Sequence, residues 1–127
     1  MVAKISIGSS LYGALAYNGE KINEARGRIL GSNKVVIPLD GHARIAQMVE
    51  DFKSFMPKMG RTKKPVLHIS LNPHPDDRLT DQDFEILARE YLDKLGFGDQ
   101  PFVIYKHEDI DRHHIHIVTV NVKPTSF

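Results

Sequence analysis

Histidines are concentrated near the end of this 127-residue chain. Four of its seven histidines lie within ten residues: His107, His113, His114 and His116. In a β-strand, His114 and His116 share one face, whereas His113 faces the other way. His107 joins the pair if the strands on either side of the intervening turn form a β-hairpin. Three neutral imidazoles then converge on one point, which is the ligand set of an open metal site.

Three histidine ligands suit Zn²⁺, Mn²⁺, Ni²⁺ or Co²⁺. The chain has no cysteine, which excludes thiolate metal sites, disulfides and thiol nucleophiles. Asp109 and Asp111 follow His107 and are candidates to accept the second ring N–H of a ligand, which would fix its tautomer. The alternative is a set of polar histidines on a strand surface. The flanking Ile115 and Ile117, which predict a core on the opposite face, favour the metal site.

Charge is distributed unevenly along the chain. Residues 1–64 carry 11 Lys/Arg and 5 Asp/Glu, whereas residues 65–127 carry 6 and 11, so the halves have net charges of +6 and −5. A basic run is a candidate for binding the phosphates of nucleic acid, with a solvated loop as the alternative: Lys58, Arg61, Lys63 and Lys64. No apolar run approaches the ~20 residues of a membrane helix and no signal peptide is evident, so we expect a cytoplasmic protein without a membrane segment.

The hydrophobic pattern alternates between a period of 2 and a period of 3.6, which predicts strands and helices in turn. The expected strands are residues 2–8, 28–38, 65–72, 101–107 and 113–122, and the expected helices are 10–17, 42–56 and 81–95. This order predicts a single α+β domain, in which one largely antiparallel sheet is covered by helices.

Particular residues set the expected boundaries. Ser9 and Ser10 offer caps for the first helix, which we expect to end at Asn18-Gly19. Val35, Val36 and Ile37 form the centre of the expected second strand. Thr80 caps the last helix, with Asp83 at the reciprocal position of a capping box.

Two more expectations concern single side chains. Tyr12 and Tyr17 lie about 140° apart around the first helix, so they cannot both point at one site. His68 alternates with Ser70 on the third strand, and we expect it to be a hydrogen-bonded sheet histidine beside the metal site rather than a ligand.

Three segments together resemble the motifs of the relaxase/mobilization nuclease family, the HUH endonucleases. Residues 107–118 (HEDIDRHHIHIV) resemble its third motif, and residues 8–18 (GSSLYGALAYN) resemble its first, which ends with a nucleophilic tyrosine. Residues 68–73 (HISLNP), followed by 79–81 (LTD), resemble the second. The motifs occur in the family's order, and their details are similar to mobilization proteins of Bacteroides-type mobilizable elements.

The resemblance implies a fold and an activity. The fold is a two-layer sandwich with a five-stranded antiparallel sheet. The activity is nicking of single-stranded DNA at a transfer origin, with Tyr17 as the nucleophile that forms a 5′-phosphotyrosyl intermediate. Mg²⁺ or Mn²⁺ would assist the reaction, and Asp109 or Asp111 would act as a base. Ser70, Asn72 and Arg112 are candidate DNA contacts, although many members carry histidine at the position of Arg112.

The family also implies partners and a setting. Relaxases act in the bacterial cytoplasm with accessory mobilization proteins and the coupling protein of a type IV secretion system. Because family members usually continue beyond this domain, we expect residues 1–127 to be the N-terminal part of a longer protein. Two alternatives remain: another HUH enzyme, such as a rolling-circle initiator or a transposase, and a non-catalytic metal- or DNA-binding accessory module. The position of Tyr17 before the His pair disfavours the initiator and the transposase.

Overall fold

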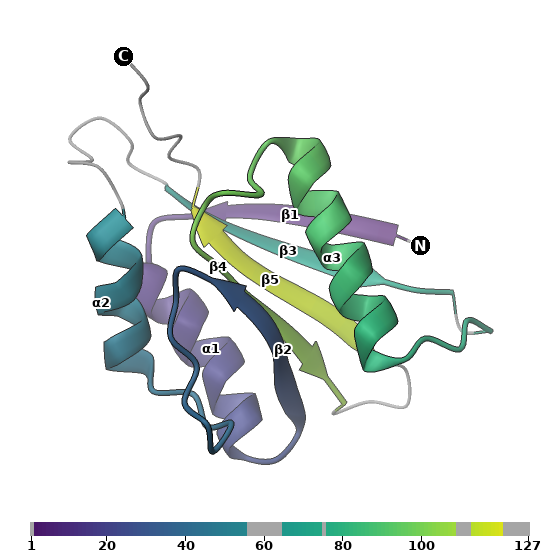
Figure 1. Ribbon diagram of the computed structural model, residues 1–127, viewed down its shortest axis with the longest axis horizontal. Helices are drawn as coiled ribbons and strands as arrows, with labels where there is room; N and C mark the ends of the chain where they lie inside the picture. The colour runs from purple at the N-terminus through teal and green to yellow at the C-terminus, as the bar shows by residue number, and fades with distance from the viewer. Residues whose placement is uncertain (1, 56–64, 75, 109–112, 121–127) are drawn as a thin grey trace.

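The computed structural model describes residues 2–55, 65–74, 76–108 and 113–120. The elements follow the order β1 (Val2–Gly8), α1 (Leu11–Asn23), β2 (Gly27–Asn33), α2 (Ile45–Phe55), β3 (Val66–Asn72), α3 (Asp81–Leu95), β4 (Phe102–His107) and β5 (His114–Val120). This is the expected alternation of strands and helices, ending in two consecutive strands (Figure 1).

The five strands form one antiparallel sheet in the order β1-β3-β5-β4-β2. The last strand in the chain, β5, is therefore the central strand of the sheet, between β3 and β4. The α+β class and the five-stranded antiparallel sheet with helices packed on it are confirmed.

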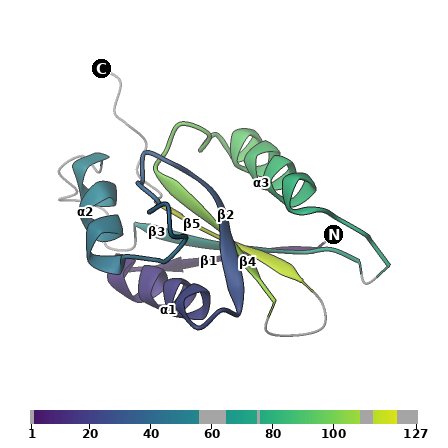
Figure 2. The same cartoon turned by 60° about the horizontal axis from the view of Figure 1, so that its bottom comes forward.

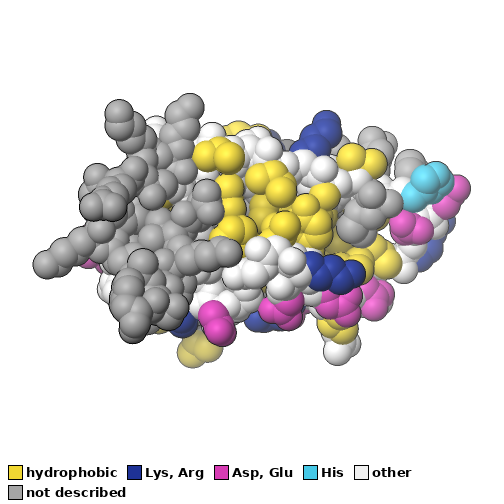
Figure 3. All heavy atoms as spheres, turned by 90° about the horizontal axis from the view of Figure 1, so that it is seen from above, with side chains coloured by type: hydrophobic (Ala, Val, Ile, Leu, Met, Phe, Trp, Pro, Cys, Tyr) yellow, Lys and Arg dark blue, Asp and Glu magenta, His cyan; other side chains and the backbone are white. Residues whose placement is uncertain are grey.

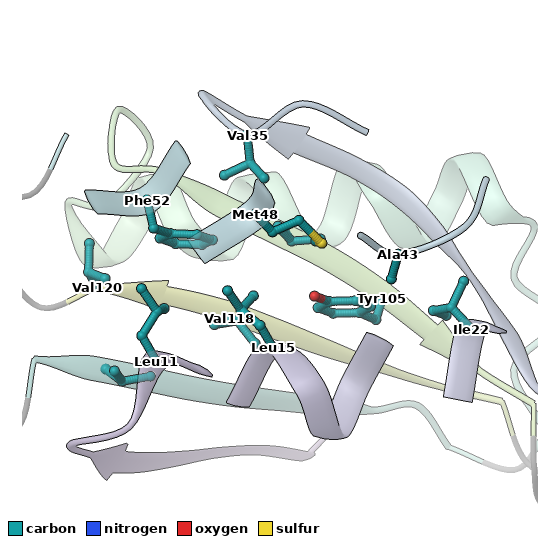
Figure 4. Packing of buried hydrophobic residues seen from close by; sticks show 12 residues of the cluster. Leu11, Leu15, Ile22, Val35, Ala43, Met48, Phe52, Tyr105, Val118 and Val120 are labelled. Carbon is teal, nitrogen blue, oxygen red and sulfur yellow. The ribbon is translucent and has the colours of Figure 1, made fainter. Parts of the chain in front are cut away.

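Helices cover both faces of the sheet, so the two-layer expectation is corrected to three layers (Figure 2). Helices α1 and α2 pack on one face, around a core that includes Leu15, Met48 and Phe52 (Figure 4). Helix α3 packs on the other face through Phe84 and Leu92. Alternate residues of the inner strands enter the two cores, because successive side chains of a strand point to opposite faces.

Helix α1 is longer than expected: it continues through Asn18-Gly19 to Asn23. Asn18 lies buried within the helix, and its side-chain amide donates to the Ala14 carbonyl at 2.8 Å. Gly19 lies where the chain before α2 approaches closely, since a Cβ at this position would be 2.9 Å from Ala43 Cβ. The expected N-cap is confirmed, with the Ser10 hydroxyl accepting from the Gly13 amide.

The second strand is also displaced from its expected centre. β2 ends at Asn33, its last residue paired with β4, and Lys34 then adopts a positive φ of 60° that turns the chain away. Val35 is buried in the core without being in a strand, while Val36 is exposed. The apolar side chain of Val35 fills the core and does not belong to a residue that pairs in the sheet.

The two later helices agree more closely with expectation. The capping box of α3 is present, with Thr80 and Asp83 bonded reciprocally, and Gly96 caps its C-terminus with a φ of 85°. α2 begins at Ile45 rather than residue 42. No helix in the described part of the chain is long and apolar enough to cross a membrane.

Strand β1 forms one edge of the sheet and exposes apolar side chains there, namely Val2, Ile5 and Ile7. Figure 3, which looks onto this side of the molecule, shows apolar side chains gathered across its middle.

Candidate metal centre and its surroundings

The expected hairpin of β4 and β5 carries the histidine cluster. His107 and His114 are directly opposite each other in the antiparallel register. His114 and His116 alternate with Ile115 and Ile117, which are buried in the core beneath α3. The three histidines therefore share the face that α1 and α2 cover in part, as strand alternation predicts. His113 precedes β5 and is exposed.

The three imidazoles form a compact group. One nitrogen from each of His107, His114 and His116 lies within 4.8 Å of the others. The rings of His107 and His116 are stacked with centroids 4.2 Å apart, and His116 Nε2 is 2.8 Å from His114 Nδ1. His107 is fully buried, whereas the other two are half-buried, so the group is partly accessible to solvent through His114 and His116. Grouped imidazole nitrogens with an accessible side fit a divalent transition-metal ion.

A fourth histidine belongs to the same cluster. His68 Nε2 is 3.0 Å from His116 Nδ1, and the two rings are stacked. His68 is thus the hydrogen-bonded sheet histidine that was expected beside the site, and its partner is one of the three grouped histidines. Such a contact on the second ring nitrogen fixes which nitrogen of a ligand faces a metal.

Burial favours the neutral form of two of these rings, those of His116 and His68. Desolvation is the largest cause that lowers the pKa of His116 to about 2, followed by the neighbouring histidines. Desolvation also lowers the pKa of His68. A neutral imidazole retains the lone pair that a metal ligand or a hydrogen-bond acceptor needs. His116 can therefore bind a cation without first having to lose a proton at neutral pH.

Polar side chains of β3 continue the histidine face along the sheet, and we call Ser70 and Asn72 together the polar floor. Ser70 is directly opposite His116, and Asn72 follows it on β3 with its side-chain amide 3.4 Å from the Ser70 hydroxyl. Lys4 of β1 is opposite Ser70 on the other side and is exposed. The two candidate DNA contacts, Ser70 and Asn72, are half-buried on the same sheet face as the cluster.

Helix α1 lies beside this face and carries both candidate tyrosines. Tyr12 and Tyr17 are 62% and 56% exposed. Because α1 extends to Asn23, Tyr17 lies in the body of the helix and not at its end. Lys21 follows one turn later, with its Nζ 5.0 Å from the centroid of the Tyr17 ring. From the sequence, no role was expected for Lys21. The only signal for its contact with Tyr17 was the spacing of four residues, which makes two side chains neighbours on a helix.

An ion-pair network holds the outer end of the hairpin against α3. Lys106 Nζ is 2.6 Å from Asp81 Oδ1, and Arg28 contacts both Asp81 and Glu108 at 3.1 and 3.4 Å. The hydrogen bond from Lys106 is the main cause that lowers the pKa of Asp81. Since Lys106 precedes His107, the network fixes the strand end that presents this histidine.

Several expected site residues lie outside the described part of the chain. These are Lys58, Arg61, Lys63, Lys64, Asp109, Asp111 and Arg112. Their proposed roles in DNA binding or in orienting a ligand remain predictions.

A comparison with known protein families assigns this chain to one of them. The sequence model of the family described as "Relaxase: MobA/VirD2-like, nuclease domain" matches residues 17–127. The chain belongs to this relaxase family. No curated protein and no solved structure matches it significantly. The match begins at Tyr17 and includes every histidine of the cluster in the relaxase domain.

Family membership and geometry agree on the class of protein. A relaxase nuclease domain is a DNA-nicking enzyme, and the three-histidine group is consistent with the metal site of an HUH nuclease. The family match does not distinguish the type of mobile element, so the similarity to Bacteroides-type mobilization proteins rests on the quoted motifs alone.

Proposed function

We propose that this relaxase domain nicks single-stranded DNA at a transfer origin by tyrosine transesterification, with Tyr17 as the nucleophile. The product would be a 5′-phosphotyrosyl link and a free 3′-hydroxyl, and the reaction would serve conjugative mobilization. The single observation that carries this proposal is the three-histidine group on the sheet face that α1 packs against, in a chain of the relaxase family.

Elimination among the four tyrosines supports Tyr17. Tyr105 is opposite His116 but fully buried, and burial raises its pKa, so its phenol is a poor nucleophile. Tyr91 packs beside the core beneath α3, on the opposite face of the sheet. Tyr12 and Tyr17 are both exposed on α1, and Tyr17 is the one whose ring contacts Lys21.

The proposed step conserves the energy of the phosphodiester. The Tyr17 hydroxyl oxygen attacks phosphorus, an oxygen–phosphorus bond forms, and the bond from phosphorus to the 3′ oxygen breaks. The phenol loses its proton and the departing 3′ oxygen gains one, so the reaction has no net proton change. Because a phenol has a pKa of ~10, a nearby base assists, and Asp109 and Asp111 are the candidates.

His107, His114 and His116 would hold the divalent ion, which we take to be Mg²⁺ or Mn²⁺ in function, with Zn²⁺, Ni²⁺ or Co²⁺ as alternatives. When bound, such an ion supplies positive charge that stabilises the negative charge building up on the phosphate during displacement. His68 orients His116, and Asp109 or Asp111 would orient another ligand.

The substrate would lie along the polar floor. Ser70 and Asn72 offer hydrogen-bond donors there, and Arg112 with the basic run at Lys58, Arg61, Lys63 and Lys64 would bind phosphates. We further propose a bacterial cytoplasmic location, a relationship to Bacteroides-type mobilizable elements, and action with accessory mobilization proteins and a type IV secretion coupling protein. The location and the partners are supported by resemblance to the family, and the relationship to Bacteroides-type elements is supported by the quoted motifs alone.

A covalent-adduct assay tests the proposal. Single-stranded oligonucleotides that tile both strands of the encoding element are incubated with the protein and Mg²⁺ or Mn²⁺, and the products are separated on denaturing gels. We expect one oligonucleotide to yield a protein–DNA adduct. Tyr17→Phe should abolish the adduct and leave DNA binding largely intact, whereas Tyr12→Phe should retain it.

The outcomes separate the alternatives. If the adduct persists in Tyr17→Phe and disappears in Tyr12→Phe, the assignment of Tyr17 as the nucleophile is wrong, and the assignment to the family is unaffected. DNA or metal binding without an adduct from any oligonucleotide would favour the non-catalytic accessory module.

A further inference from the structure

Lys21 lies beside Tyr17 on the helix that packs against the strands of the histidine cluster. Its ammonium is 5.0 Å from the centroid of the Tyr17 ring, one turn earlier on α1. The side chain is half-buried, on a helix whose Leu15 and Ile22 are anchored in the core. α1 packs against β3, β4 and β5, the three strands that carry the clustered histidines. The ammonium is therefore held beside Tyr17 by the fold of the domain.

Geometry places Lys21 beside the proposed nucleophile. Its ammonium lies over the ring of Tyr17, and both residues are on α1. Because α1 packs against the strands that carry the histidines, a phosphate attacked by Tyr17 would also come within reach of Lys21.

The chemistry of this position favours an anion. A lysine ammonium is a compact charge with three hydrogen-bond donors and no acceptor. A second cation bound by the histidines would repel it, and an anion between the two would relieve that repulsion. In single-stranded DNA, the anion available is a backbone phosphate.

We propose that Lys21 is a catalytic residue that binds the scissile phosphate between Tyr17 and the histidine cluster. Its ammonium donates a hydrogen bond to a non-bridging oxygen and keeps its protons throughout the reaction. Contact with the Tyr17 ring also limits the orientation of the phenol. This proposal rests on the nicking function proposed above and adds the residue that grips the substrate from the helix side.

The test compares three variants. Lys21→Met removes the charge and has a similar length, and Lys21→Arg keeps the charge. Lys94→Met is a matched control at an exposed position of α3, on the other side of the sheet. The first measurement is the rate of adduct formation with the nicked oligonucleotide. We expect a fall of about 10- to 100-fold for Lys21→Met, the range for loss of a hydrogen bond to a charged group. Lys21→Arg should keep most of the rate, and Lys94→Met all of it.

The second measurement does not require nicking. In the Tyr17→Phe background, fluorescence anisotropy gives the affinity for a labelled 30-nucleotide oligo(dT) over a range of salt concentrations. Loss of one phosphate contact should reduce the slope of log K against log salt by about 0.7 in Lys21→Met and leave it unchanged in Lys94→Met.

A third measurement separates substrate binding from a structural role. Mn²⁺ affinity, measured by calorimetry without DNA, should be unchanged or tighter in Lys21→Met, because a repelling charge has been removed. Weaker Mn²⁺ binding would mean that Lys21 maintains the cluster, and would overturn the proposal. An unchanged rate and an unchanged salt slope would also overturn it while nicking by the wild type stands. If the wild type forms no adduct, the nicking function fails, and the salt slope still decides whether Lys21 contacts phosphate.

Discussion

Removal of single histidines should divide the cluster into ligands, an orienting residue and a bystander. His107, His114 and His116 are grouped closely enough to share one ion, whereas His113 is exposed and precedes the strand. A bound ion stabilises the folded state by mass action. We therefore expect metal-induced stabilisation to be lost in the ligand variants to Ala and to be retained in His113→Ala.

The size of the effect follows from linkage. At an Mn²⁺ concentration 100 times the dissociation constant, binding stabilises the fold by about 2.7 kcal/mol. For 127 residues the unfolding entropy is about 0.27 kcal/mol per kelvin, so the melting temperature should rise by about 10 °C. If loss of a ligand weakens binding about 100-fold, the rise falls to about 1.5 °C at the same Mn²⁺ concentration.

His68→Ala should be intermediate. His68 contacts His116 but is not among the three grouped nitrogens. Loss of a partner that orients a ligand costs about 10-fold in metal affinity, which leaves a rise of about 5 °C.

Differential scanning fluorimetry measures these shifts. Each variant is compared with its own EDTA-treated form, because truncating a buried histidine also changes the stability of the metal-free protein. Equal shifts for His113→Ala and His114→Ala would refute the strand geometry on which the assignment rests. A full shift in His116→Ala would remove this residue from the ligand set.

Three further predictions concern the fold and the DNA. Gly19→Ala should lower the free energy of unfolding by about 1 to 2 kcal/mol in urea titrations, because the new Cβ would be 2.9 Å from Ala43 Cβ. This loss should exceed the gain from the better helix propensity of alanine. Gly8→Ala is the neutral control, since a Cβ at that position would have nothing within 4 Å. The pKa of Asp81 is lowered in the folded state, so its contribution to the free energy of unfolding is present above the unfolded pKa of ~3.9 and is lost as the pH falls through the folded value. In urea titrations at several pH values, Asp81→Asn should therefore lack this part of the acid destabilisation. A pH profile identical to that of the wild type would contradict the role of the hydrogen bond from Lys106. Replacing Lys58, Arg61, Lys63 and Lys64 together by Ala should reduce the salt slope of single-strand binding by about 0.7 for each lost phosphate contact, and an unchanged slope would favour a solvated loop.

Local rules were sufficient for much of the hairpin and its chemistry. The alternation of His114 and His116 with Ile115 and Ile117 determined their faces, because the side-chain period of a strand is two. The capping box at Thr80 and Asp83 likewise depends only on residues three apart, and it formed as predicted. The order of motifs was enough to indicate the relaxase family, which the match over residues 17–127 supports.

Other features depended on contacts between distant segments. Asn18-Gly19 has the composition of a helix end, yet α1 continues because Gly19 packs against Ala43 and Ile45, far along the chain. Val35 has the composition of a strand residue, yet it fills a core after β2 has ended. Local propensity is weak compared with tertiary packing, so it gave the wrong answer at both places.

The site itself was completed by sheet order. Insertion of β5 between β3 and β4 brings His68 against His116 and puts Ser70 opposite the same histidine. The short connection predicts that β4 and β5 pair as a hairpin. No spacing in the sequence specifies that β3 is the other neighbour of β5, because that choice depends on how both faces of the sheet are buried. The sequence therefore determined the ligand types and their faces, and the tertiary structure decided which side chains surround them.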